Sequence, residues 1–184
     1  MFALAPGKGI SAHREAGSVL HAYAQLNRPA AWIDGIDFDN AGAARVRVAA
    51  EFGGWALALT ALITDSDGPL IPRMIYALPD AHRWNRAPGV TLIGDAAHLM
   101  PPSGEGANLA MFDGAGLAKA IATHPEDIEA ALAAHEEAMF PRSASEATDA
   151  RQVLEVCLGE RAPFSLVEFF TSVREQQHQL RGQR

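Results

Sequence analysis

The sequence has little cysteine and no long apolar run. Cys157 is the single cysteine among 184 residues, so an intramolecular disulfide is excluded and a reducing, cytoplasmic location is favoured. The strongest apolar run, from Trp55 to Ile63, is too short to span a bilayer. The N-terminus lacks a basic segment followed by a long apolar one, so we expect no signal peptide.

Positive charge is also scarce. The chain has 15 lysines and arginines against 22 aspartates and glutamates, a net charge of −7, and it contains no basic run. Nucleic acids and anionic membrane surfaces attract basic patches, so we expect neither as a partner. Hydrophobic residues make up 48% of the sequence, which is enough to build a packed core in a chain of this length.

The apolar periodicity predicts a mixed chain, α+β or α/β, in which strands dominate the first part and helices the last. The predicted strands cover residues 2–5, 10–12, 18–26, 70–78 and 90–93. Residues 37–40 supply helix-capping side chains, and a predicted helix follows them over residues 41–52. The other predicted helices cover residues 55–64, 108–122, 125–158 and 164–177. Pro141 predicts a bend or break in the helix over residues 125–158, because proline cannot continue the backbone hydrogen bonding.

A glycine pattern near the N-terminus is similar to a dinucleotide-binding motif but lies in a different local context. Gly7 to Ala12 formally matches G-x-G-x-x-A, the pattern of dinucleotide-binding folds. That pattern must open a helix within a β-α-β unit, whereas Gly17 and an alternating strand follow here. We therefore interpret the segment as a hairpin turn.

Residues 94–108 carry most of the functional information, because they join a predicted strand to a predicted helix. Asp95 follows the strand and can accept hydrogen bonds from ligand hydroxyls, such as those of a ribose or ribityl chain. Gly104 and Gly106 lack Cβ atoms, so backbone amides can approach a flat ligand closely. The helix that begins near Ala107 offers free N–H groups and a positive dipole end to an anionic group.

With its GDAAH start, its Pro-Pro pair and its Gly-x-Gly-x-Asn end, this segment resembles the second flavin-binding motif of class A FAD-dependent aromatic hydroxylases. That group includes p-hydroxybenzoate hydroxylase and the tetracycline destructases. The resemblance implies a p-hydroxybenzoate-hydroxylase-like fold, in which a substrate-domain antiparallel sheet precedes the FAD-motif strand and the C-terminal helices. It assigns seven residues to FAD binding: Gly94, Asp95, Pro102, Gly104, Gly106, Ala107 and Asn108. Ser103 alone stands where the destructases have one residue more.

The resemblance implies an FAD-dependent monooxygenase that uses NAD(P)H and O₂ to hydroxylate a small organic substrate, aromatic or polycyclic. The cofactor carries that chemistry, so no catalytic residue is assigned in this chain. A substrate-contacting histidine of the destructases maps to His21, and Tyr23 and Gln25 share its face of the predicted strand. Asp95 and His98 are spaced like metal ligands, but no third ligand lies near them in the sequence, so no metal site is expected.

Family members begin with a Rossmann-type unit that holds the ADP half of FAD, and the chain contains no such unit. The resemblance therefore implies the C-terminal part of a family member, which we expect to hold FAD only weakly by itself. The expected domains are a partial substrate-binding sheet with helices over 1–84, the C-terminal portion of the FAD-binding domain over 85–158, and a C-terminal helix and tail over 159–184. The helix after the motif would present an apolar face, so we expect self-association or a partner chain to cover it.

Two alternatives remain open at this point. The chain could be a cofactor-free, catalytically inactive remnant or interaction module. It could also derive from another flavin enzyme with a Gly-Asp motif, a reductase or a halogenase. The loop from Pro102 to Asn108 favours the hydroxylases among these flavin enzymes.

Overall fold

The structure is a computed structural model that describes residues 1–182, with side chains described through residue 174. It consists of two compact units, residues 1–74 with 155–184 and residues 75–154. An antiparallel sheet comes first and several helices follow it, so the mixed α+β class is confirmed. None of the described helices combines the length and the apolar character that crossing a membrane requires.

The first unit opens with a three-stranded antiparallel sheet in the order β1-β2-β3. Its strands are β1 (Phe2–Ala5), β2 (Lys8–Arg14) and β3 (Leu20–Leu26). Gly7 forms the β1–β2 turn with a φ of 69°, a conformation that L side chains rarely adopt. The segment from Gly7 to Ala12 is therefore a hairpin turn followed by a strand, as the sequence predicts.

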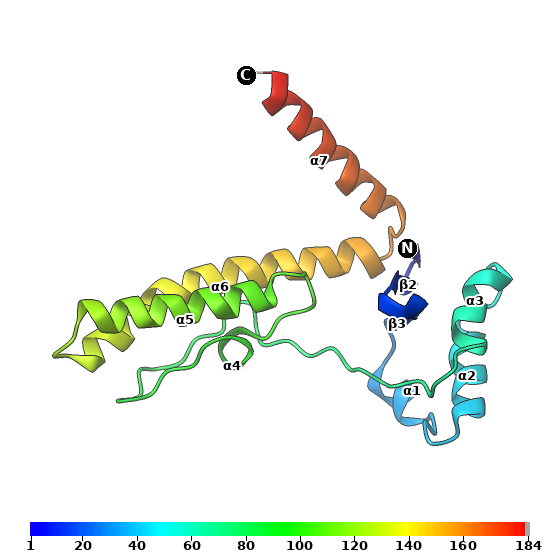
Figure 1. Cartoon of the computed structure of the whole chain (residues 1–184), viewed down its shortest axis with the longest axis horizontal. Coiled ribbons are helices and arrows are strands. Elements are labelled where there is room, and N and C mark those ends of the chain that lie inside the picture. Colours follow the sequence, from blue (N-terminus) through cyan, green and yellow to red (C-terminus); the bar gives the residue numbers. More distant parts are fainter. Residues whose placement is uncertain (183–184) are drawn as a thin grey trace. The chain divides into compact units, whose positions relative to one another are not determined.

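Helices of different lengths complete the first unit. They are η1 (Ala16–Ser18), α1 (Ala30–Asp34), α2 (Ala41–Ala50), α3 (Leu57–Thr64) and α7 (Phe164–Gly182). Asn40 caps α2, because its side-chain oxygen accepts a hydrogen bond from the amide of Ala43 at 3.0 Å. Helices α2 and α3 lie side by side (Figure 1).

The core of the first unit joins the sheet to these two helices. Ile10 of β2 is completely buried. It packs with Val48 of α2, with Ile63 of α3 and with Phe52, which lies between these two helices in sequence. Burying side chains of this size stabilises a fold by about 1.5–3 kcal/mol each. Because residues alternate along a strand, the inward position of Ile10 turns its neighbours in sequence toward the opposite face of the sheet.

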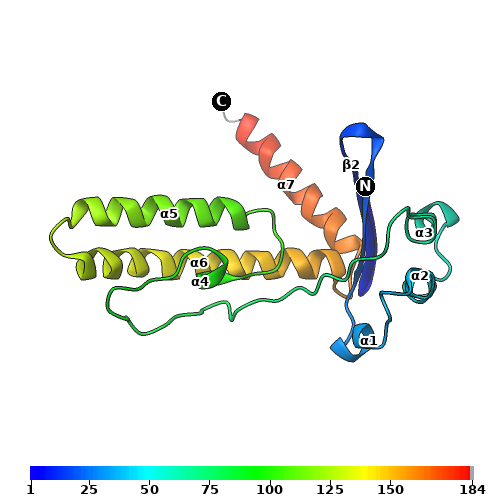
Figure 2. The same cartoon turned by 60° about the horizontal axis from the view of Figure 1, so that its bottom comes forward.

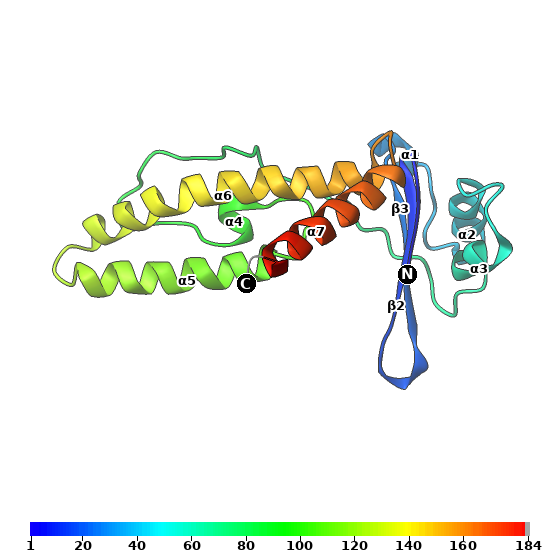
Figure 3. The same ribbon diagram turned by 90° about the horizontal axis from the view of Figure 1, so that it is seen from above.

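The second unit consists of a long coil followed by helices. These are α4 (Asp95–His98), α5 (Gly106–Thr123) and α6 (Ile128–Leu158), the last of which continues into the first unit. Helices α5 and α6 run antiparallel and side by side (Figure 2), and α4 lies beside them (Figure 3). Side chains of α5 and α6 hold the coil that precedes α4, because Asp113 accepts a hydrogen bond from Gly94 and Glu136 accepts one from Arg86.

Two predicted strands do not form. Residues 70–78 and 90–93 are coil, apart from a single bridge between Ala87 and Val90. A strand must pair its backbone groups with those of a neighbour, and the described residues 1–182 supply no partner for either segment. The expectation of an FAD-motif strand before Gly94 is therefore wrong for this structure. The helices expected after the motif do form.

Of the predicted bend or break at Pro141, the break does not occur, because α6 continues through this residue. Proline removes one backbone hydrogen bond and costs about 3 kcal/mol in a helix interior. Met139 and Ser143, on either side of Pro141, are both buried. Tertiary packing of these turns therefore outweighs the local preference that the sequence expresses.

Candidate functional site

Gly94 connects the coil to α4 and lies directly against α5. Its φ of 60° and ψ of −145° are accessible to glycine and costly for other residues. A Cβ added to Gly94 would lie 3.2 Å from the Cβ of Ala110 in α5. The amide of Gly94 donates a hydrogen bond to Asp113 Oδ2 at 3.0 Å. The backbone conformation, the close contact and the hydrogen bond together explain why glycine stands at this point.

Asp113 of α5 is completely buried and accepts hydrogen bonds from two more groups. His98 Nε2 of α4 lies 2.5 Å from Oδ2, and Arg142 Nη2 of α6 donates to Oδ1 at 2.7 Å. Burial acts to raise the pKa of Asp113, but the hydrogen bonds from His98, Gly94 and Arg142 outweigh it and hold the pKa below its ordinary value. Asp113 is therefore ionised at neutral pH and joins α4, α5 and α6 through one carboxylate.

Sequence reasoning missed Asp113, although a signal was present. Acidic residues on a helix usually face solvent, because burying a charge without partners is costly. Asp113 follows Leu109 by four residues and precedes Leu117 by four, so it lies within the apolar stripe of its helix. An acid in such a stripe indicates a buried charge with partners elsewhere in the fold.

The seven residues predicted to bind FAD gather at the start of α4 and of α5. Asp95 is exposed in the first turn of α4, and no described side chain or amide donates to its carboxylate. Gly94 directly precedes Asp95, and the other five residues belong to the loop before α5 and to the first turn of that helix. Gly104 has a φ of 95°. A Cβ placed on Gly104 or on Gly106 would have no atom within 4 Å apart from those of its neighbours along the chain. Both backbones are accessible to a ligand.

The N-terminus of α5 offers hydrogen-bond donors beside this loop. The helix begins at Gly106, and the side chain of Glu105 before it makes no capping hydrogen bond. The first amides of a helix have no acceptor within it and lie at the positive end of its dipole. The Asn108 side-chain amide donates to Glu105 Oε2 at 3.1 Å, which holds both side chains at the helix end. This end can bind a carbonyl or anionic oxygen of a ligand.

A second buried carboxylate holds the coil that leads to Gly94. Glu136 of α6 accepts hydrogen bonds at one oxygen from Trp84 Nε1 at 3.1 Å, Arg86 Nη1 at 2.9 Å and Thr91 Oγ1 at 2.8 Å. Arg86 also pairs with Glu129, which lies about two turns before Glu136 on the same helix. These polar contacts replace the strand pairing that the sequence predicts for this segment.

The three predicted substrate residues share one face of the sheet in the first unit. His21, Tyr23 and Gln25 of β3 lie opposite His13, Ser11 and Gly9 of β2 in the strand register. Rings on this face contact one another, since His13 stacks on Tyr23 with centroids 5.8 Å apart. His21 and Tyr23 are exposed and Gln25 is half-buried. The structure thus brings the three substrate candidates together in the first unit. The candidate FAD-binding residues lie in the second unit.

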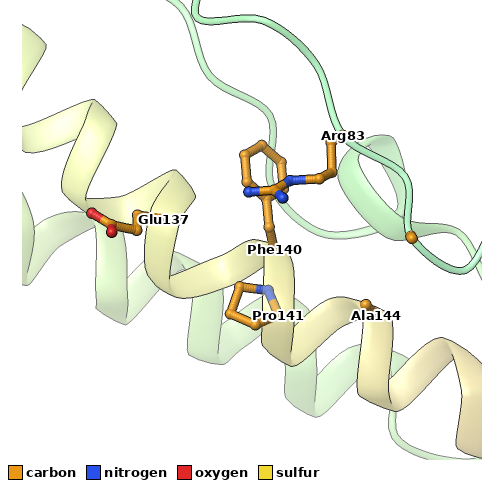
Figure 4. Close-up of a pocket in the computed structure, with 6 residues that line it drawn as sticks. Arg83, Glu137, Phe140, Pro141 and Ala144 are labelled. Carbon is orange, nitrogen blue, oxygen red and sulfur yellow. The ribbon is translucent and has the colours of Figure 1, made fainter.

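A separate pocket of about 250 Å³ lies on α6 in the second unit (Figure 4). Its lining includes Phe140 and Pro141, and the Arg83 guanidinium lies 4.9 Å from the centre of the Phe140 ring. None of the seven predicted FAD-binding residues lines this pocket. It is therefore distinct from the site at the start of α5.

Part of the second unit is similar in sequence to a known family of FAD binding domains. Residues 76–139 match the FAD binding domain family, and this span includes α4, α5 and every predicted FAD-binding residue. The chain is also 36% identical over 117 residues to an FAD-dependent urate hydroxylase of Mycolicibacterium vanbaalenii. That alignment covers 62% of this chain and 29% of the hydroxylase, so the chain spans less than a third of the length of this relative. Residues 76–139 therefore match part of an FAD binding domain, and the chain has distant homology to an FAD-dependent urate hydroxylase, which is a class A flavin monooxygenase.

Proposed function

We propose that this chain supplies the flavin-ring end of the FAD site in a monooxygenase that hydroxylates an organic substrate with NAD(P)H and O₂. The observation that carries the proposal is the fixing of Gly94 and His98 on Asp113, which leaves Asp95 exposed next to α5. The match of residues 76–139 to an FAD binding domain supports it. When bound, FAD supplies the oxygen activation, and the protein supplies orientation and electrostatics.

Each candidate residue has a distinct task in this proposal. The exposed Asp95 carboxylate accepts hydrogen bonds from the ribityl hydroxyls, because the described residues leave its acceptor sites free. The amides of Gly106 and Ala107 point outward from the start of α5 and donate to the pyrimidine edge of the flavin ring. Pro102 stiffens the loop, and Gly104 keeps the space beside the ring free of a side chain.

The proposal extends to the substrate through the polar sheet face. His21, Tyr23 and Gln25 offer an imidazole, a phenol and an amide side by side on β3. Such groups orient a planar substrate by hydrogen bonding and ring stacking. The relative is named for urate, a flat heteroaromatic molecule, and an aromatic substrate of this kind fits the proposal.

Flavin titration of the purified chain tests the proposal. We expect FMN and FAD to bind with equal, weak affinity, because the candidate residues contact the ribityl chain and the ring but not the adenosine. Asp95→Asn should weaken binding of both flavins at least tenfold, which corresponds to about 1.4 kcal/mol. The matched control is Asp149→Asn, an exposed acid on α6, which should bind as the unmodified chain does.

Two results would contradict the proposal. One is flavin binding that is the same in Asp95→Asn and in the unmodified chain, as measured by quenching of flavin fluorescence. The other is a strong preference for FAD over FMN, which would place the main contacts on the adenosine half. Absence of any flavin binding would instead support the alternative of a cofactor-free interaction module.

A further inference from the structure

The tip of the β2–β3 hairpin brings together two histidines and a glutamate. His13 of β2 and His21 of β3 are direct partners in the strand register. Glu15 follows β2 in the connection, with Oε1 lying 3.2 Å from His13 Nε2 and Oε2 lying 3.6 Å from His21 Nε2. One ligand atom from each of the three residues lies within 4.8 Å of the other two. We propose that His13, Glu15 and His21 bind a divalent transition-metal ion.

The donor set and its spacing fit such an ion. Two imidazole nitrogens and one carboxylate oxygen are preferred ligands of zinc, which binds them at about 2.0–2.2 Å. Neighbouring ligand atoms of a tetrahedral zinc site are consequently about 3.3 Å apart. The two carboxylate-to-imidazole separations lie on either side of that value. About half of each side chain is exposed, which leaves the fourth position to water and gives the ion access from solvent.

The hairpin holds the ligands in place before an ion arrives. The paired strands fix the backbones of His13 and His21 opposite each other. The amide of Glu15 donates to the carbonyl of Val19 at 2.9 Å, which closes the connection and keeps Glu15 beside the strand ends. The His13 ring is further restrained by stacking on Tyr23. Little conformational entropy is therefore lost when the three side chains converge on one ion.

The local charge also favours a cation. Glu15 supplies the negative charge, and the neutral imidazoles supply lone pairs. Arg14 lies between His13 and Glu15 in sequence, but alternation along the strand places its side chain on the other face, where its guanidinium donates to Ser18 Oγ at 3.0 Å. The nearest positive charge in the sequence is thus directed away from the ligand atoms.

The metal site goes beyond the proposed flavin function and does not depend on it. It lies in the first unit, whereas the candidate flavin residues lie in the second. His21 is the one residue to which both proposals give a ligand-binding role, and its imidazole can serve an ion or a substrate but not both at Nε2. The sequence analysis weighed only Asp95 and His98 as metal ligands, and it did not find this cluster because His21 becomes a neighbour of His13 only through strand pairing.

Zinc titration of the tag-free chain, without added flavin, tests the proposal by calorimetry. We expect one Zn²⁺ per chain, and we expect His13→Ala, His21→Ala and Glu15→Gln each to weaken binding at least tenfold. His82→Ala serves as the matched control, because His82 also lies beside an aromatic ring but outside the cluster, and it should bind zinc as the unmodified chain does. Circular dichroism of each variant verifies the fold.

A measurement on the unmodified chain keeps the test independent of any variant that fails to fold. In imidazole-detected ¹H–¹⁵N spectra, Zn²⁺ should shift the ring signals of His13 and His21 and leave those of His82 and His124 in place. The proposal is overturned if the chain binds no zinc, if the three ligand variants bind as tightly as the control, or if zinc shifts other histidines instead.

Discussion

Gly94 and Asp113 are joined across 19 positions of sequence by a hydrogen bond of 3.0 Å from a backbone amide to a buried carboxylate. The bond fixes the start of the GDAAH segment on α5, so the exposed position of Asp95 depends on a residue outside that segment. Removal of either partner should therefore affect both the fold of the second unit and any ligand that Asp95 binds.

Gly94→Ala should destabilise the second unit by about 2 kcal/mol. The substitution forces a left-handed backbone conformation on a residue with a Cβ and presses that Cβ against Ala110. Urea unfolding followed by circular dichroism measures the change. Gly68→Ala is the matched control, since Gly68 has open space around it, and a loss equal to that of the control would show that the Gly94 contact is unimportant.

Asp113→Asn should lower the free energy of unfolding by about 3 kcal/mol. The amide cannot accept from Gly94, His98 and Arg142 as an ionised carboxylate does, and the Arg142 guanidinium loses its counter-ion. Chemical unfolding measures the loss, and Asp149→Asn again provides the exposed control. If both variants unfold at the same urea concentration, Asp113 does not hold the three helices together.

The stability of the second unit should fall as the pH decreases from 7 to 5. Burial lowers the pKa of His135 below its ordinary value of 6.5, so the unfolded chain takes up a proton more readily than the folded one. This contribution is complete above pH 6.5 and is lost as the pH falls toward the folded pKa. The lowered pKa of Asp113 adds a further loss only below its ordinary value of 3.8.

Urea unfolding at pH 7.5, 6.5 and 5.5 measures this dependence on acidity. His135→Leu removes the titrating group, so the free energy of unfolding should change less between these pH values in the variant than in the unmodified chain. An equal slope in both proteins would assign the pH dependence to other groups.

The exposed apolar side chains of α5 should drive weak self-association. Met111 is 67% exposed and the neighbouring Phe112 is 59% exposed, although both belong to the most apolar part of the helix. Met111→Lys should weaken association at least tenfold in sedimentation velocity runs over a range of concentrations. Val46→Lys removes an equally exposed apolar residue from the first unit and should have no effect. A monomer at every concentration would contradict the prediction.

Local sequence predicted the elements whose causes are local. The alternation of β3, the glycine turn before β2, the Asn40 cap of α2 and the apolar repeat of α5 each lie within a few residues of the structure they determine. A short loop connects Asp95 of α4 to the candidate residues at the start of α5, and their binding of FAD stays a prediction. The family assignment from residues 94–108 is confirmed by the match over residues 76–139.

What the sequence did not predict depends on partners far along the chain. The apolar residues 90–93 have a strand pattern, but a strand forms only when another strand lies next to it. Pro141 has a local tendency to interrupt a helix, and only the packing of α6 reveals that it does not. The roles of Asp113 and Glu136 depend on groups 19 to 52 residues away, which periodicity cannot identify.

The loop between α4 and α5 lies between two fixed ends. His98 is held on Asp113 before the loop, and Leu109 is buried in α5 after it. A residue inserted or deleted near Ser103 would change the loop without moving either end. Length variation at this point is therefore structurally inexpensive, and it would reshape the surface beside Asp95 while α4 and α5 keep their geometry.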